Sequence, residues 1–173
     1  MANYAVVRTD KLMGTDTRSM LETVKYMGAG STATAIENGN VVKVDGTLLA
    51  DSDGVTIREI KKGVTPAATS KLDEIVLIAT PEVMYDERKK GLHEFINEAG
   101  KLARGYHLHS GDIFSVTAEA LVNASPAVDQ IIELAASTKW NNVVTATAGS
   151  TVIGKIIAID VVGRYTYYVI QVA

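Results

Sequence analysis

The sequence predicts a mainly β protein: a short-stranded β domain with an N-terminal arm and one short helix, followed by a small C-terminal β barrel. The first observation is composition, because the 173 residues include 20 Val, 14 Ile and 17 Thr but only 11 Leu. Branching at Cβ restricts χ1 in a helix and packs well on a pleated sheet. The second is that the apolar runs are short and separated by turn signals, a spacing typical of barrels and sandwiches.

The first 35 residues form the predicted N-terminal arm or loosely packed extension. They carry scattered small and polar residues and one apolar cluster around Met20, Leu21, Val24 and Met27. Such a segment either gains order on the surface of a partner or forms a loose strand pair on the protein's own core. Both alternatives stay open from the sequence.

Residues 36–123 form the predicted β-rich domain. Asn38-Gly39 and Asp45-Gly46 are tight-turn signals, and they flank a strand only a few residues long. Further strands are expected at 74–80 and 111–117. Apolar residues recur at helical spacing within 81–103, but Gly91 and Gly100 each cost about 1 kcal/mol inside a helix, so a short helix there stays open. Thr117 precedes good helix formers and predicts one or two helical turns over 117–122.

Residues 124–173 form the predicted small barrel, after a boundary at the small residues and proline of 123–126. Strands are expected at 128–134, 143–146, 151–162 and 165–172. The last two are joined by Gly163-Arg164 and predict a long hairpin. Its two faces would carry Tyr165, Tyr167 and Val169 on one side and Thr166, Tyr168 and Ile170 on the other. Because both faces are apolar, one of them is expected to be shielded by another domain or chain.

Charge and composition exclude several classes of function. The 17 Lys and Arg against 20 Asp and Glu give a net charge of −3 and a pI near 5.6, which does not favour nucleic acid. The absence of Cys removes thiol catalysis, thiolate metal sites and disulfides. The opening residues contain no apolar signal region, and the charge-free stretch 140–154 is too polar to span a bilayer. We expect neither a nucleic-acid nor a membrane partner.

No residue pattern predicts catalysis. The serines lie outside any nucleophile elbow, and the acidic residues of 82–98 alternate with basic ones as on a solvated face. The most interesting pair is His107 and His109, which would share one face of a strand and could hold a metal with Asp112 or Glu94 as third ligand. Solvated surface histidines explain the same pattern. We therefore expect no enzyme, no cofactor and no bound metal.

The residues predicted to contact a partner lie in the arm and in the C-terminal barrel. Trp140 stands between polar neighbours, as either a contact anchor or the lid of the barrel. Each of the candidates could instead be internal core. The predicted contact residues are Tyr4, Val6, Met20, Leu21, Met27, Trp140, Tyr165, Tyr167 and Tyr168.

Three segments resemble the head decoration proteins, also called auxiliary capsid or cement proteins, of tailed bacteriophages. They are EFINEAGKLARGYHLHSGDIFSVTAEAL at 94–121, STVIGKIIAIDVVGRYTYYVIQVA at 150–173 and the opening MANYAVVRTDKLMGT. The shared features are apolar and glycine positions. The resemblance implies that Gly100, Arg104, Gly105, Gly111 and Asp112 are turn and strand-register positions, and it transfers no contact residue.

The resemblance implies a structural virion protein that binds the exterior of a capsid and stabilises the shell against internal DNA pressure. Its expected partners are the phage major capsid protein and further copies of itself, on the outer surface of the virion after synthesis in the bacterial host cytoplasm. Three alternatives remain. One is a β module that binds a glycan or surface polymer through Trp140 and the terminal tyrosines, another is a tail or baseplate component, and the last is a metalloprotein built on the histidines.

Overall fold

The computed structural model describes residues 3–8, 21–50, 56–83 and 91–173, and the described residues form ten strands and four short 3-10 turns. The mainly β prediction is confirmed. The strands are β1 (Leu21–Tyr26), β2 (Val41–Ala50), β3 (Thr56–Val64), β4 (Ile75–Ile78), β5 (Ala103–His107), β6 (Ile113–Val116), β7 (Ile131–Glu133), β8 (Asn141–Val143), β9 (Val152–Val162) and β10 (Tyr165–Val172). The turns are η3 (Ala29–Ser31), η4 (Leu72–Glu74), η5 (Leu92–Glu94) and η6 (Ala118–Ala120).

Strands β1 to β5 close into a barrel in the order β1-β3-β2-β4-β5. β1 runs parallel to β3 and antiparallel to β5. Two glycines make room inside this small barrel: a Cβ at Gly63 would lie 2.5 Å from Cγ1 of Val24, and one at Gly105 would lie 2.7 Å from Cγ2 of Val76. The interior is filled by Val24, Ile36, Val42, Val76, Ile78 and Ala103.

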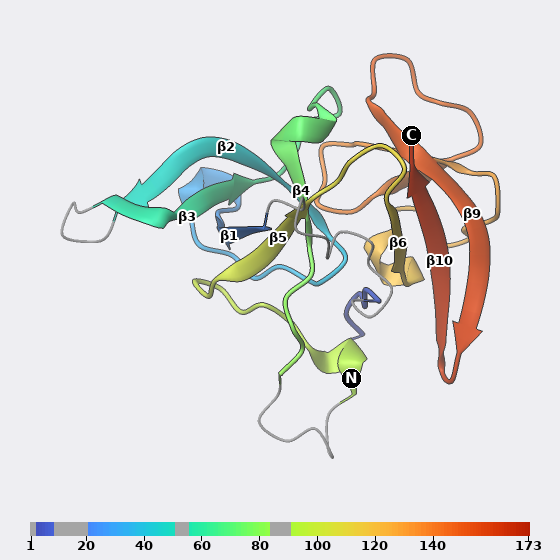
Figure 1. Cartoon of the computed structure of the whole chain (residues 1–173), viewed down its shortest axis with the longest axis horizontal. Helices are drawn as coiled ribbons and strands as arrows, with labels where there is room; N and C mark the ends of the chain where they lie inside the picture. The colour runs from blue at the N-terminus through green and yellow to red at the C-terminus, as the bar shows by residue number, and fades with distance from the viewer. Residues whose placement is uncertain (1–2, 9–20, 51–55, 84–90) are drawn as a thin grey trace.

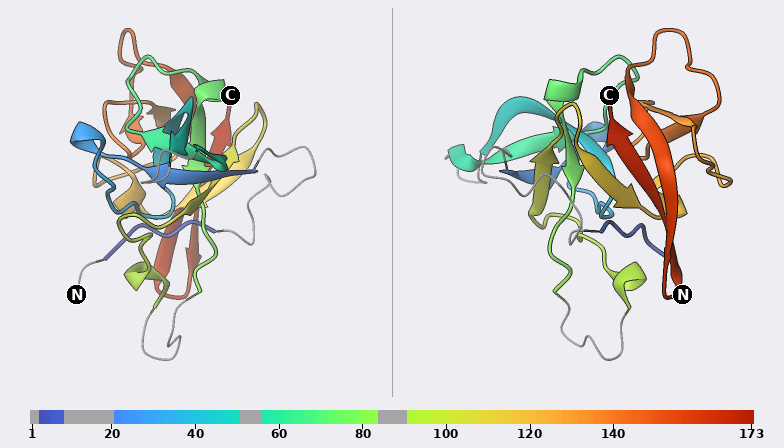
Figure 2. Two further views of the ribbon diagram at one scale, coloured as in Figure 1. Left: turned by 90° about the vertical axis from the view of Figure 1, so that its left-hand side faces the viewer. Right: turned by 45° about the vertical axis from the view of Figure 1, so that its right-hand side comes forward.

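The remaining strands form an open sheet in the order β6-β10-β9-β7-β8, which lies beside the barrel (Figures 1 and 2). All the pairings in this sheet are antiparallel. The N-terminal segment 3–8 runs along the outer edge of β6, where Val7 bridges Val116. Ala5, Val6 and Val7 are buried. For residues 3–8 the structure therefore favours a strand packed on the protein's own core.

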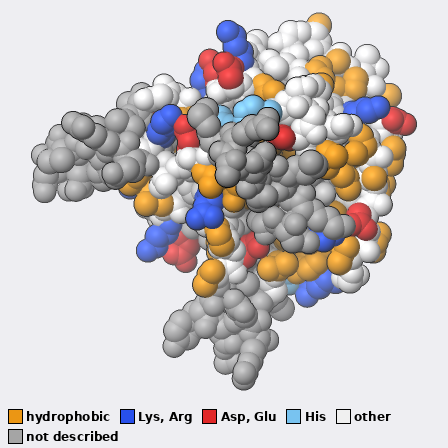
Figure 3. All heavy atoms as spheres, in the orientation of Figure 1, with side chains coloured by type: hydrophobic (Ala, Val, Ile, Leu, Met, Phe, Trp, Pro, Cys, Tyr) orange, Lys and Arg blue, Asp and Glu red, His pale blue; other side chains and the backbone are white. Residues whose placement is uncertain are grey.

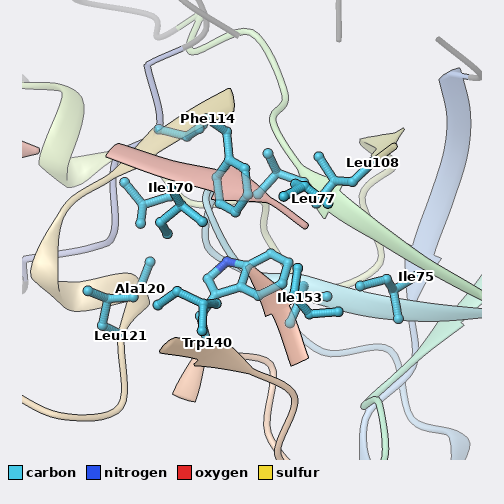
Figure 4. Packing of buried hydrophobic residues seen from close by; sticks show 14 of the residues in the cluster. Ile75, Leu77, Leu108, Phe114, Ala120, Leu121, Trp140, Ile153 and Ile170 are labelled. Carbon is cyan, nitrogen blue, oxygen red and sulfur yellow. The ribbon is translucent and has the colours of Figure 1, made fainter. Parts of the chain in front are cut away.

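One hydrophobic core joins the barrel to the open sheet. Side chains alternate along β4, so that Val76 and Ile78 point into the barrel while Ile75 and Leu77 belong to the shared core. This double burial explains why β4 is an uninterrupted apolar run. Figure 4 shows the centre of the shared core, where the rings of Phe114 and Trp140 lie 5.3 Å apart.

The closed barrel lies in a different part of the chain from the one predicted. Its strands β1 to β5 fall between Leu21 and His107, whereas residues 124–173 supply β7 to β10 of the open sheet. Alternating apolar residues are required equally by a closed barrel and by a sheet that covers another layer, so the pattern alone could not distinguish the two. The boundary at 123 and 124 stays a prediction, although β6 precedes it and pairs with β10.

Several predicted strands and turns are corrected in detail. β2 does not end at Asp45-Gly46 but continues through it, with Gly46 at φ +76° and a shift in register between Val44 and Leu48. The expected strand at 143–146 is displaced to β8. β10 matches its predicted range, while β1, β3 and β5 were not predicted.

The two helical predictions have different outcomes. Within the described part of 81–103 only Leu92–Glu94 is helical, as a single 3-10 turn. The expected turn after Thr117 is confirmed as Ala118–Ala120. Thr117 does not cap it with its side chain, because its Oγ1 accepts a hydrogen bond from the backbone N–H of Val6 at 3.2 Å. The hydroxyl thus anchors the N-terminal segment.

Candidate contact surfaces

The predicted contact residues divide by burial. Trp140, Val6 and Tyr167 are 0%, 1% and 4% exposed, so for these three the alternative of an internal core position is confirmed. Tyr4, Met27, Tyr165 and Tyr168 are half-buried, Leu21 is 53% exposed, and Met20 lies outside the described residues. Contact with a partner stays a prediction for the accessible members of the set.

Trp140 is a structural residue between the sheets rather than a surface platform. Its indole N–H donates a hydrogen bond of 2.7 Å to the carbonyl of Gly39, which ties the open sheet to the segment before β2. A glycan-stacking surface that uses this ring would need it to be accessible. The glycan-binding alternative therefore lacks the stacking ring that it assigned to Trp140.

A cluster at the tip of the β9–β10 hairpin brings together residues from three distant segments. The hairpin-tip cluster consists of Arg8, His93, Asp160, Arg164, Tyr165 and Tyr167. The two faces predicted for β10 are confirmed by its pairing with β9, in which Tyr167 faces Asp160 and Tyr168 faces Ile159. The cluster occupies the Tyr165 and Tyr167 face, which is shielded by the chain's own N-terminal segment and η5.

His93 is held between two side chains of the hairpin. Its Nε2 lies 3.2 Å from Nη2 of Arg164, and its Nδ1 lies 3.1 Å from the hydroxyl of Tyr165. Because a guanidinium can only donate, Nε2 accepts, and the ring proton is assigned to Nδ1, which donates to Tyr165. The imidazole therefore bridges η5 and the hairpin.

Arg8 fixes the N-terminal segment to the same face. Its guanidinium lies 5.4 Å from the centre of the Tyr167 ring, and its Nη1 lies 3.2 Å from Oδ2 of Asp160. Only 13% of its side chain is exposed. Partial burial strengthens both the ion pair and the cation–π contact relative to a surface pair.

A cavity of about 110 Å³ adjoins this cluster and brings together three of the predicted contact residues, Tyr4, Val6 and Tyr165. Sequence reasoning missed His93, Arg8 and Arg164 beside them. Their partners are 71 to 152 positions away along the chain. No local spacing signals contacts of that kind.

A second polar cluster lies inside one end of the barrel. Glu22, Lys61 and His107 stand on the same strand faces as Val24, Gly63 and Gly105, so alternation places them in the interior. Oε1 of Glu22 lies 2.6 Å from Nζ of Lys61 and 3.2 Å from Nε2 of His107. Burial raises the pKa of Glu22. The hydrogen bond from Lys61 and the nearby His107 ring lower this pKa by more, so that its net value lies below the ordinary 4.5.

The two histidines weighed as a metal grip lie in different surroundings. His107 is 8% exposed inside the barrel, while the side chain of His109 is 56% exposed and lies 3.6 Å from Asp112. The strand ends between them at His107. The Lys61 ammonium already neutralises the carboxylate beside His107. The described part of the chain contains no group of three or more His, Asp or Glu side chains placed to bind a metal.

The exposed apolar side chains gather in two main places. One is the 80–102 groove, defined by Pro81, Val83, Phe95, Ile96 and Leu102, which encloses about 480 Å³ and is rimmed by Glu94, Glu98 and Lys101. Val83 is 78% exposed and Leu102 is 47% exposed. Such a groove, lined by both apolar and charged residues, has the mixed composition of a protein-contact surface.

The other apolar surface is the outer half of β9, defined as residues 157–162. Ile159, Val161 and Val162 are 44%, 68% and 43% exposed. Figure 3 shows hydrophobic side chains collected on the side of the molecule where β9 and β10 lie. A third, more scattered set comprises Val122, Val128 and Val144 in loops.

Comparison of the chain with protein-family models, curated proteins and solved structures found no match. Among the described residues, no helix is long and apolar enough to cross a bilayer.

Proposed function

We propose that this protein is a structural virion protein that binds the exterior of a tailed-phage capsid and stabilises the shell. The proposal begins from the resemblance of 94–121 and 150–173 to head decoration proteins. In the proposed setting its partners are the major capsid protein and neighbouring copies, on the outer surface of the virion, after synthesis in the bacterial host cytoplasm.

The observation that carries the proposal is the presence of two separate apolar surfaces on a small β fold. The 80–102 groove is lined by residues next to the barrel, and the outer half of β9 belongs to the open sheet. A shell-binding protein needs one surface for the shell and profits from a second for its neighbours. Repeated copies on a shell then gain avidity, which exceeds single-site affinity by roughly 10² to 10⁴.

The groove is the surface we assign to the shell. Val83 and Leu102 present the most exposed apolar area there, and the surrounding charges of Glu94, Glu98 and Lys101 can set orientation. Its dimensions suit a loop or extended segment with one or two apolar anchors.

The test is co-sedimentation with shells assembled from the major capsid protein of the same genome. The double variant Val83→Asp/Leu102→Asp should reduce shell occupancy at least about tenfold, because it replaces two exposed apolar side chains of the groove with charged ones. Val144→Asp is the matched control, since Val144 is 81% exposed and lies outside the groove. Equal binding by both variants would remove the groove assignment, and no binding by the folded parent protein would remove the proposed function.

A further inference from the structure

The outer half of β9 is an unpaired strand edge in the described structure. β10 pairs with β9 along its length, whereas β7 pairs with its opposite side only over Val152–Lys155. The last backbone contacts on that side are from Ile156 N–H to the Gln130 carbonyl and from Asp129 N–H to the Ile156 carbonyl, at 2.9 and 2.8 Å. Beyond them no described segment pairs with 157–162, and Figure 1 shows β9 at the margin of the fold.

Of the usual devices that prevent strand addition, this edge carries a β-bulge at its start: Val169 pairs with Ala158 and Ile170 with Ile156, so that Ile157 is skipped. From Ala158 to Val162 the register with β10 is regular. Its sequence, Ile157-Ala158-Ile159-Asp160-Val161-Val162, contains no proline and no lysine and is rich in β-branched residues. Its one charge, Asp160, is already bound by Arg8 on one face of the sheet. The backbone groups of such an edge are a template for another extended chain.

The apolar face of the edge continues the protein's own core layer. Val161 lies opposite Thr166 and Ile159 opposite Tyr168, so Ile159 and Val161 share the face on which Tyr168 packs against the shared core. A strand added at this edge would extend that layer and cover the two exposed side chains. The partner must therefore present an extended segment with apolar residues at alternate positions.

The same segment of a second copy meets this requirement, because it is already extended and needs no ordering on binding. In an antiparallel pair centred on Ile159, Ile159 faces its own equivalent, and Val161 lies opposite the bulge at Ile157 of the other copy. Asp160 then faces Ala158 rather than a second carboxylate. A two-fold axis satisfies both edges at once and closes the assembly.

We propose that β9 pairs antiparallel with β9 of a second copy, about a two-fold axis at Ile159, so that residues 157–161 of the two copies lie opposite each other and the two open sheets join into one. The arrangement does not depend on the proposed function, because it requires only this chain. A strand from an unlike protein is the competing occupant of the edge.

The test uses the purified full chain, in which the absence of Cys makes single-cysteine variants unambiguous. Under mild oxidation Ile159→Cys should form a disulfide-linked dimer, because opposed Cβ atoms across an antiparallel pair lie about 4.5 to 5.5 Å apart. Val161→Cys on the same face would lie about 13 Å from its equivalent, four strand positions away, and should not. Val144→Cys, at an 81% exposed loop position, reports random collision.

Sedimentation equilibrium supplies the second readout. The parent chain should have the mass of two copies, and Ile159→Lys should raise the dissociation constant at least about tenfold, since like charges would face each other at the axis. Val144→Lys should leave the dimer intact, and circular dichroism should show all variants folded. A monomeric parent chain at its highest soluble concentration, a dimer insensitive to Ile159→Lys, or cross-linking at 161 in preference to 159 would each overturn the proposal.

Discussion

Individual buried polar residues hold particular segments of this fold in place through hydrogen bonds, and Glu133 is the clearest example. Its side chain is fully buried, and its two oxygens accept hydrogen bonds from Nδ2 of Asn141 and the backbone N–H of Thr147, both at 2.8 Å. Burial raises its pKa, but the hydrogen bonds from Thr147 and Asn141 lower it more, to a net value below 4.5. The charged carboxylate thus pins the segment after β8.

Glu133→Gln should lower the free energy of unfolding by about 1 to 3 kcal/mol at neutral pH, because a buried, charged acceptor of two hydrogen bonds is lost. Since the folded-state pKa is lowered, the stabilisation by Glu133 is present above the unfolded value near 4.5 and is lost as the pH falls through the folded value. Urea denaturation across this range should show the parent and variant converging in acid. The exposed Glu98→Gln should match the parent, and a pH-independent gap would contradict a charged Glu133.

Trp140→Phe should destabilise the protein by about 2 to 3 kcal/mol, because it leaves space in the core and leaves the Gly39 carbonyl without its donor. Urea denaturation followed by far-UV circular dichroism measures the loss. Leu21→Ala, at a 53% exposed position, should change stability by less than about 0.5 kcal/mol. If Trp140→Phe left the free energy of unfolding unchanged, the Trp140 ring would not fill the core as described.

At this scale the sequence predicted which side chains share a face but not which are buried. Alternation alone placed Tyr165 and Tyr167 together, and the structure agrees. The polar neighbours of Trp140 left open whether its ring is a contact anchor or a lid over the core, and the structure buries it fully within the core. Burial there depends on strands far along the chain, and local composition does not record them.

Among the described strand pairs, β9 and β10 share the longest register, and Gly154 makes their approach close. A Cβ at Gly154 would lie 2.0 Å from the carbonyl oxygen of Gln171, which is backbone and cannot rotate away. The glycine therefore permits the close approach of the two strands at the end where β7 also pairs. Its role is steric.

Gly154→Ala should lower the free energy of unfolding by about 2 to 3 kcal/mol or more, because one of the two strands must shift. Gly63→Ala is the comparison, since its Cβ would meet Cγ1 of Val24, a side-chain atom that can move. Thermal unfolding of both variants should show the larger loss for Gly154→Ala. A smaller loss than for Gly63→Ala would contradict the close strand approach.

Element prediction succeeded where strands are long and bounded by clear turns, as for β10. It failed at Asp45-Gly46, where a turn signal marks an irregularity inside β2. It also missed β3, whose sequence contains several charged residues that interrupt the apolar alternation expected of a strand. One of these residues, Lys61, faces the barrel interior, where it pairs with Glu22. Local signals do not separate a bulge from a turn, or an interior ion pair from solvent.

On the scale of the whole molecule, a single core connects the barrel and the open sheet. Val41, Ile75 and Leu77 from the barrel pack in the same cluster as Phe114 and other residues of the second sheet. Neither sheet can lose the other without exposing this apolar surface to water. The fold class could be predicted from the β-branched composition. Which part of the chain closes into the barrel and which part forms the open sheet could not, because that depends on which sheet faces pack against each other.

The chain should therefore unfold in one cooperative transition, and the fragment 124–173 should not fold alone, since it lacks β6 and the barrel residues of the core. Urea unfolding followed by Trp140 fluorescence and by far-UV circular dichroism should give coincident curves. The fragment should show the spectrum of an unfolded chain. Two separate transitions, or a folded fragment, would contradict the shared core.

The proposed shell-binding role is tested most directly by heating shells of the major capsid protein with and without the purified full-length chain, after co-sedimentation has established occupancy. We expect saturable binding and a higher rupture temperature for occupied shells. Folded protein that fails to bind, or that binds without changing the rupture temperature, would contradict a stabilising role on the capsid.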